Sequence, residues 1–328
     1  MNPNWKNFLL AEHAEFNNAA EITFPKPMHD NDLRIYPVAD FGVLSFSGKD
    51  AAMLLQGQIT CNINDISEGK SSLGAICNPK GRVISTFLLV KTAVGFLMVL
   101  PKELLETVKK RLSMFILRSV VTITDCSEEY CLIGLSRPEM TVSGLFDTIQ
   151  NEVIKVNFGK RDLIITEISQ AIAYWAARVS ESYQPYGSAE WRLLDMLSGI
   201  PWLSQETSEE FIPQMLNLDR LGGISFNKGC YTGQEIVART HYLGKAKRAM
   251  FLAECQSINS PSPKTTVFDD NISDSPDQLE PGVGKVLSAQ VRAGKCYLLI
   301  VLQISETDTY QLKLADQTKL ILLPFVFS

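Results

Sequence analysis

The chain is short of the residues that build metal centres and hydrolytic sites. It has three histidines, His13, His29 and His241, which are widely scattered, and its seven cysteines include no C-x-x-C pair. These residues are too few and too scattered to form a zinc ribbon, a disulfide framework or a Ser-His-Asp triad. We therefore expect no metal site. An odd number of unpaired thiols is typical of a reducing compartment, and we expect a cytoplasmic protein.

Long apolar runs and targeting patterns are also missing. The N-terminus lacks a basic segment followed by an apolar one, and the longest apolar stretches, such as 298–302 and 320–327, have the length of strands. We therefore expect neither a signal peptide nor contact with a membrane.

Positive charge is in deficit over the chain as a whole. There are 31 Lys and Arg against 36 Asp and Glu, a net charge of -5. Because nonspecific nucleic-acid affinity comes mainly from clustered cations, any nucleic-acid role is expected to be local or indirect. One segment is an exception, with five basic residues and one acid, an excess of 5 - 1 = 4; they are Lys228, Arg239, Lys245, Lys247, Arg248 and Glu235. Either an anion is bound nearby or these are solvated surface charges.

The length of 328 residues and a hydrophobic content of 45% allow two or three domains with a substantial core. Strand-like and helical patterns alternate without a βαβ series, which predicts the α+β class. Expected elements include a β-hairpin around Asn78–Gly81, a helix that begins near Pro101, and a helix that Ser188 caps and that carries Trp191. We expect an N-terminal extension (1–32), two α+β domains (33–138 and 139–247) and a small C-terminal β-barrel (248–328).

The most informative segment is KGCYTGQE, residues 228–235. It places Cys230 beside a lysine and between two glycines. Glycine permits positive φ and close approach of a ligand, and a nearby cation favours the thiolate, so this pattern suits an exposed, working thiol. The alternative is that Cys230 is a small buried hydrophobe in a tight turn.

KGCYTGQE, the preceding FIPQ and LGGISF, LQGQIT at 55–60 and CNPKGR at 77–82 together resemble the signature of the YgfZ family, within the glycine-cleavage T-protein (aminomethyltransferase) superfamily. The resemblance covers most of residues 35–250. It implies a three-part architecture in which two ferredoxin-like α+β halves and the C-terminal β-barrel surround a central cavity that holds a folate.

The resemblance also implies functional residues. Trp191 matches a family tryptophan that contacts folate, whereas a second family tryptophan is replaced here by Phe41, which keeps an aromatic surface but loses the indole N–H. By composition alone, an aromatic residue on an amphipathic helix is more often core. Further residues of the signature are expected to line the site or shape its loop: Lys228, Tyr231, Gln234, Glu235 and Arg239.

One departure bears on the reaction. Aminomethyltransferases carry an acidic pair on the strand after the glycine turn, and this chain has Ser85 and Thr86 there. A hydroxyl does not replace a carboxylate that must hold charge or pass a proton, so an active one-carbon transferase is a weaker alternative. The resemblance implies a tetrahydrofolate-binding protein that supports iron-sulfur enzymes or their assembly, and through them tRNA modification, with Cys230 as the functional thiol. Its effect on tRNA is then expected to be indirect, and a direct tRNA-binding module is the weaker alternative because the chain is acidic.

Overall fold

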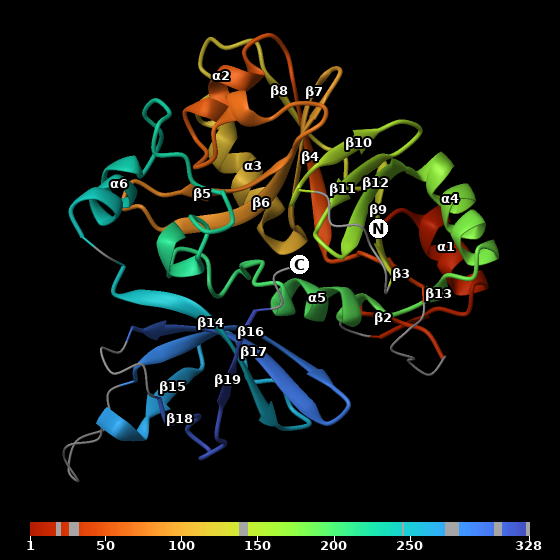
Figure 1. Cartoon of the computed structure of the whole chain (residues 1–328). Helices are drawn as coiled ribbons and strands as arrows, with labels where there is room; N and C mark the ends of the chain where they lie inside the picture. The colour runs from red at the N-terminus through yellow and green to blue at the C-terminus, as the bar shows by residue number, and fades with distance from the viewer. Residues whose placement is uncertain are drawn as a thin grey trace.

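The computed structural model describes residues 1–17, 21–25, 33–137, 144–244, 246–272, 282–304 and 310–325. Three large sheets, a two-stranded sheet of β1 (Glu15–Phe16) and β2 (Ile22–Thr23), and a few helices make up the described molecule, and the strands of the C-terminal sheet form one end of it (Figure 1). The expected boundary between residues 138 and 139, and the expected basic residue Lys245, lie outside the described residues.

The first sheet is antiparallel, in the order β5-β6-β7-β4-β8. Its strands are β4 (Phe41–Ser47), β5 (Ser72–Cys77), β6 (Val83–Thr92), β7 (Gly95–Pro101) and β8 (Thr122–Asp125). The β5–β6 hairpin forms where turn chemistry predicts it. One face packs on α2 (Ala51–Gln56) and α3 (Leu105–Ser113), which contribute Leu55, Val108 and Leu112 to a fully buried apolar cluster.

The second sheet has the order β10-β11-β12-β9-β3-β13 and combines distant parts of the chain. Its strands are β3 (Arg34–Pro37), β9 (Tyr130–Ser136), β10 (Thr148–Gln150), β11 (Ile154–Asn157), β12 (Arg161–Glu167) and β13 (Gln184–Pro185). The β3 and β9 strands fall within 33–138, so that segment supplies strands to both sheets.

Helices cover both faces of the second sheet. On one face, α1 (Pro3–Ala11) and α4 (Ile168–Ser180) pack together, and Trp5 meets Trp175 edge to face at 5.6 Å. The other face carries α5 (Ser188–Leu197). The expectation that Ser188 caps α5 is wrong, because Gly187 is the cap residue and the Ser188 hydroxyl instead accepts a hydrogen bond from the backbone N–H of Ile22.

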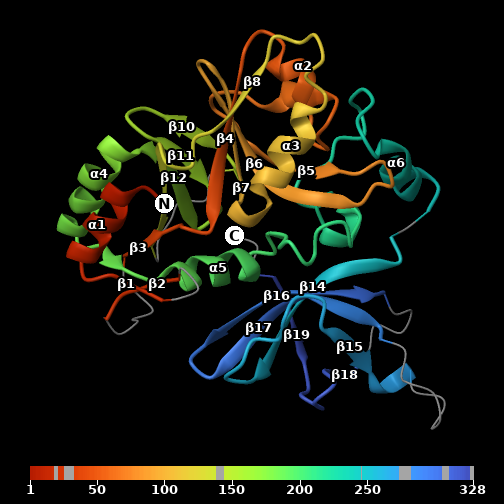
Figure 2. The same cartoon turned by 180° about the vertical axis from the view of Figure 1, so that it is seen from behind.

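The C-terminal strands form a six-stranded, barrel-like sheet in the order β18-β15-β16-β17-β14-β19, seen from behind in Figure 2. The strands are β14 (Arg248–Gln256), β15 (Thr266–Asp269), β16 (Gly284–Arg292), β17 (Lys295–Gln303), β18 (Leu312–Lys313) and β19 (Ile321–Leu323). This confirms the expected α+β class and C-terminal β-barrel.

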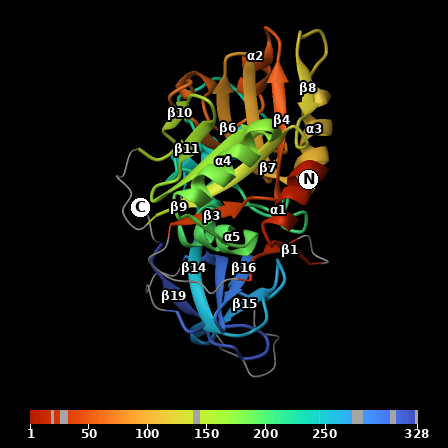
Figure 3. The same cartoon turned by 90° about the vertical axis from the view of Figure 1, so that its right-hand side faces the viewer.

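The three parts meet around α5 and the short 3-10 helix η3 (Pro213–Leu216). The α5 helix contacts β3 on one side and β16 and β17 on the other, while η3 contacts β14. Figure 3 shows α5 lying between the second sheet above and the barrel-like sheet below.

No helix in the described ranges is long and apolar enough to cross a bilayer.

Candidate functional site: the thiol loop and the junction pocket

Three sequence motifs that lie far apart in the chain come together around the segment 228–235, which we call the signature loop. Thr232 donates from its backbone N–H to Gly57 O (3.3 Å) and from its hydroxyl to Gln58 Oε1 (3.0 Å). Nearby, the Thr60 hydroxyl donates to Gly223 O at 2.6 Å. The LQGQIT segment is thus joined directly to LGGISF and to the signature loop.

The CNPKGR motif meets the signature loop through two glycines. Gly233 has φ +84°, and a Cβ there would lie 2.5 Å from Asn78 O and 3.0 Å from the Cα of Gly81. Gly81 has φ +69°, and its Cβ would lie 2.8 Å from the Cβ of Ile236. Side chains cannot fit at this contact. The hairpin turn therefore lies directly against the start of α6 (Gln234–Tyr242), as Figure 1 shows.

Cys230 is the only exposed cysteine of the seven, all of which lie in described parts of the chain. The buried six are Cys61, Cys77, Cys126, Cys131, Cys255 and Cys296. Burial raises the pKa of Cys61 and of Cys77 to about 12, so these two remain protonated and unreactive at neutral pH. The loop presents one thiol to solvent, as the exposed-thiol interpretation predicts.

Lys228 anchors the loop from inside. The residue is 9% exposed, and its ammonium donates to Ile59 O (2.7 Å) and Cys61 O (2.8 Å) and lies 5.0 Å from the centre of the Tyr231 ring. Burial lowers the pKa of Lys228 to about 8, and the nearby Cys61 opposes this shift. Within the described residues no carboxylate lies in ion-pair range of this ammonium, and two backbone carbonyls and the Tyr231 ring hold it.

The remaining signature residues divide between loop and surface. Tyr231 is buried, and its backbone N–H donates to Gln234 Oε1 at 3.3 Å, which closes the turn before α6. Glu235 and Arg239, with side chains 80% and 62% exposed, form an ion pair of 3.0 Å along α6. Such a pair, solvated and one turn apart, contributes little to stability.

Trp191 lies deep on α5 and is 2% exposed. Its indole covers Gly134 of β9 so closely that a Cβ there would lie 2.2 Å from the ring. The Arg161 guanidinium carbon is 4.6 Å from the ring centre, a cation–π contact. Tyr36 completes the surroundings at 5.7 Å.

Behind Trp191 runs a buried polar chain that the sequence analysis missed. Arg161 Nη1 lies 2.6 Å from Asp195 Oδ1, with side chains only 4% and 2% exposed. Asp195 Oδ2 accepts a 2.7 Å hydrogen bond from Trp202 Nε1. Burial raises the pKa of Asp195, while Arg161 and Trp202 oppose that shift. Arg161 Nη2 is buried without an acceptor among the described residues.

A pocket of about 380 Å³ opens where the three parts meet. Phe41 and Trp202 line it, with ring centres 4.8 Å apart in an edge-to-face arrangement. Met196 of α5, Leu287 of β16 and the nearby Ile200 and Leu203 form much of the apolar wall. Asp40 and Glu103 bring carboxylates to the pocket, and Arg192 of α5 pairs with Asp40 at 2.6 Å. We call this the junction pocket. Phe41 borders it directly, whereas Trp191 lies behind it and connects to it through Arg161, Asp195 and Trp202.

Ser85 and Thr86, which the resemblance places at the acidic pair of aminomethyltransferases, are almost fully buried. The Ser85 hydroxyl donates to Thr86 O (2.9 Å), and the Thr86 hydroxyl donates to Pro201 O (2.6 Å). Both hydroxyl protons are thus engaged by backbone carbonyls, in roles that support the fold.

The chain was compared with family models, with curated proteins and with solved structures. No family model matches the chain. The chain is 32% identical over 292 residues to the tRNA-modifying protein YgfZ of Colwellia psychrerythraea, covering 85% of this chain and 88% of that protein. It is 30% identical to the protein of that name from Vibrio atlanticus, covering 90% and 93%.

Among solved structures, the glycine cleavage system aminomethyltransferase T of Bartonella henselae superposes with a TM-score of 0.78. The match covers 100% of this chain and 98% of that one at 13% identity, which shows the T-protein fold. With three motifs joined around one exposed thiol, and relatives matched over most of their length, the chain belongs to the YgfZ family.

Proposed function

We propose that this protein is a cytoplasmic folate-binding protein that supports iron-sulfur enzymes and thereby tRNA modification, with Cys230 as its working thiol. The observation that carries the proposal is the exposure of Cys230 while six other cysteines are buried. Two glycine contacts and a buried lysine hold the loop that presents it. The names of the YgfZ relatives support the link to tRNA modification.

The junction pocket has the character that a tetrahydrofolate would need. Its volume of about 380 Å³ falls in the usual range for small-molecule sites, and it combines two aromatic rings with a few polar groups. Phe41 and Trp202 would pack against the flat ring system, and carboxylates such as Glu103 would accept from its N–H edge. Trp191 and the partly unpaired Arg161 would back this wall. When bound, a reduced folate can carry a one-carbon unit.

The thiol is tested in cells that lack this protein. The measure is the level of a tRNA modification that depends on an iron-sulfur enzyme, read by mass spectrometry of digested tRNA. Wild type and the control Cys126→Ser, which changes a buried cysteine, should both restore it. Cys230→Ser should not restore it although the protein accumulates normally. Full restoration by Cys230→Ser would show that the sulfur has no working role.

Folate binding is tested separately by calorimetric titration with tetrahydrofolate. Phe41→Ala should weaken binding about 2- to 13-fold, because an aromatic contact of about 0.5 to 1.5 kcal/mol is lost. Phe115→Ala, at a partly exposed phenylalanine outside the pocket, is the control and should bind as wild type does. Equal affinity of the Phe41→Ala variant and the control would remove the junction pocket from the proposal.

The one-carbon transferase alternative makes a different prediction. It requires folate-dependent turnover of an amine or methyl donor, which needs a group that can pass a proton. The hydroxyls of Ser85 and Thr86 are committed to backbone carbonyls and do not favour it.

A further inference from the structure

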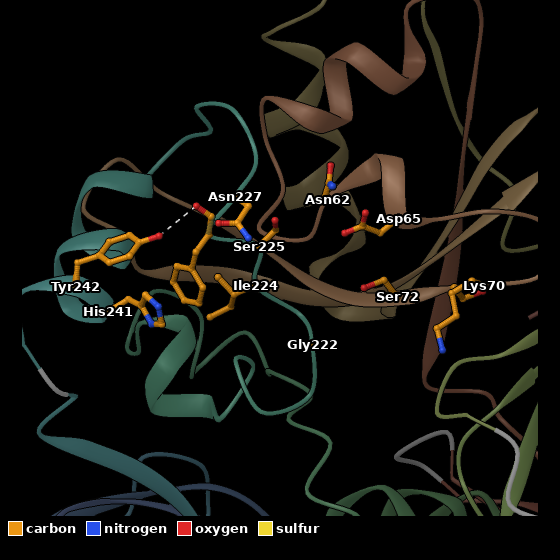
Figure 4. A pocket seen from close by; sticks show the side chains of 12 residues that line it. Asn62, Asp65, Lys70, Ser72, Gly222, Ile224, Ser225, Asn227, His241 and Tyr242 are labelled. Atoms are coloured by element: carbon orange, nitrogen blue, oxygen red, sulfur yellow. Dashed lines mark hydrogen bonds between the residues drawn. The ribbon is translucent and has the colours of Figure 1, made fainter.

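A second cavity, of about 440 Å³, lies beside the signature loop, between the end of α6 and the 3-10 helix η1 (Ile63–Asp65) (Figure 4). Neither Phe41 nor Trp191 lines it. The proposed folate site therefore leaves this cavity without a role. We call it the α6 cavity.

One wall of the α6 cavity is a cluster of flat rings. Phe226 and His241 stack at 3.7 Å with an interplanar angle of 11°, and Tyr242 meets the His241 ring edge to face at 4.8 Å. The Tyr242 hydroxyl reaches Phe226 O at 3.5 Å, drawn as the dashed line in Figure 4, and the residue is still 63% exposed. Exposed aromatic faces of this kind suit another flat ring.

The other wall is polar and does not favour an anion. Lys70 belongs to it, but its ammonium lies 2.8 Å from Asp147 Oδ1 and is neutralised there. Asp65 is exposed, and within the described ranges no cation lies in ion-pair range of its carboxylate. Asn62 is fixed by accepting from Gln56 Nε2 at 2.9 Å, and its amide N–H₂ has no acceptor in the described part of the chain. A bound phosphate would face Asp65, whereas a ring with N–H donors would complement it.

These features select a class of ligand. A flat heterocycle with two adjacent N–H donors can stack on the rings while a carboxylate accepts both donors. Guanine, with its N1–H and its 2-amino group, is the common base that has such an edge.

The surroundings favour a base that belongs to a strand. Leu243, next to Tyr242, is 83% exposed, and Lys247 and Arg248 follow as exposed cations. Beyond the cavity, the next base of a strand could contact Leu243, and the cations could meet its phosphates; a free nucleotide would use neither. Asn227 borders the cavity three residues before Cys230, so at most about 11 Å of chain separates the two.

We propose that the α6 cavity binds one unpaired guanine of an RNA strand, which brings that RNA next to the exposed thiol. This goes beyond the proposed function, which requires no contact between the protein and RNA. Binding by stacking also explains how an acidic protein could hold RNA, because only a few phosphates need to be met.

The test uses the full-length protein and fluorescein-labelled single-stranded RNA of 12 nucleotides, read by anisotropy. One RNA is polyuridine with a single central guanosine, and the others carry inosine or uridine at that position. Wild type should prefer guanosine to inosine by about tenfold, since inosine lacks the 2-amino group. Tyr242→Ala should weaken binding about 5- to 150-fold, the range for loss of one stacked base.

Matched variants separate the parts of the proposal. Met53→Ala, at an equally exposed apolar residue on α2, should bind RNA as wild type does. Asp65→Asn should reduce the preference for guanosine over inosine while leaving the polyuridine affinity unchanged. Folate titration of the Tyr242→Ala protein should be unchanged, so loss of the RNA site and failure of the folate site are distinguishable.

Several results would overturn the proposal. These are no preference for guanosine, unchanged RNA affinity in Tyr242→Ala, or displacement of the RNA by tetrahydrofolate. A fourth such result is displacement of the labelled RNA by free GMP at the concentration at which unlabelled RNA displaces it. The cavity would then bind a free nucleotide and not an RNA strand.

Discussion

The buried Arg161–Asp195 pair offers the sharpest test of how the candidate site is held. Asp195→Ala leaves a guanidinium that is 4% exposed without its counter-charge and leaves the Trp202 indole N–H without its acceptor. Removing one partner of a buried pair costs about 3 to 5 kcal/mol. We therefore expect a large loss of stability from this single substitution.

The loss can be converted into a melting shift. Unfolding entropy of about 2.1 cal/mol/K per residue gives about 0.7 kcal/mol/K for 328 residues. The shift in Tm should then be about 4 to 7 °C downward, measured by differential scanning calorimetry. Because a chain of three parts can melt in stages, the transition that moves should be one in which tryptophan fluorescence changes.

Two further variants isolate the charge. Asp195→Asn preserves an oxygen acceptor for Trp202. It should still show most of the destabilisation expected for Asp195→Ala, because the charge of Arg161 remains uncompensated. The double variant Arg161→Met with Asp195→Leu removes both charges and should recover most of the loss. A shift below 1 °C for Asp195→Ala, or a double variant that is no more stable than Asp195→Ala, would refute the reasoning.

Three other predictions concern the signature loop and the pocket. The lowered pKa of Lys228 means that the unfolded chain binds more protons between pH 8 and 10.5, so wild type should gain stability relative to Lys228→Met as pH rises through that window, by at most about 1.4 kcal/mol per pH unit in paired urea titrations; no relative gain would contradict it. Gly233→Ala places a Cβ 2.5 Å from Asn78 O and should lower stability by at least about 1 kcal/mol in the same assay, unlike Gly229→Ala, where a Cβ meets nothing within 4 Å. Trp202→Phe should weaken tetrahydrofolate binding and lower the Tm, because the hydrogen bond to a charged acceptor is worth about 1.5 to 3 kcal/mol; unchanged affinity would exclude Trp202 from the site.

Much of the fold follows from local patterns in the sequence. Asn78–Gly81 forms the hairpin turn because Gly81 supplies φ +69°, and the apolar runs on either side become β5 and β6. Pairing between distant strands does not follow in this way. The β3 and β9 strands join the second sheet through contacts about 100 residues apart in the chain, which no local pattern encodes.

Some residues of the candidate site can be predicted from the sequence and others cannot. Cys230 was accessible to sequence reasoning because its neighbours, a lysine and two glycines, lie within a few residues. Lys228 was expected to act on the thiol, yet its ammonium binds the carbonyls of Ile59 and Cys61, which only the fold brings near. Arg161 and Asp195 carry no local signal, since an arginine in a strand and an aspartate in a helix look like surface residues.

The α6 cavity was hidden for the same reason. Phe226, His241 and Tyr242 belong to two segments, and their stacking depends on the turn that leads from the signature loop into α6. A lone histidine gave no reason to expect an aromatic cluster.

The most direct measurement is alkylation of the native protein with a maleimide at neutral pH, followed by peptide mass spectrometry over time. One adduct should form rapidly, on Cys230, while Cys61 and Cys77 react only after denaturation. Protection of Cys230 in the native protein, or equally fast labelling of the buried cysteines, would contradict the claim that the signature loop presents a single accessible thiol.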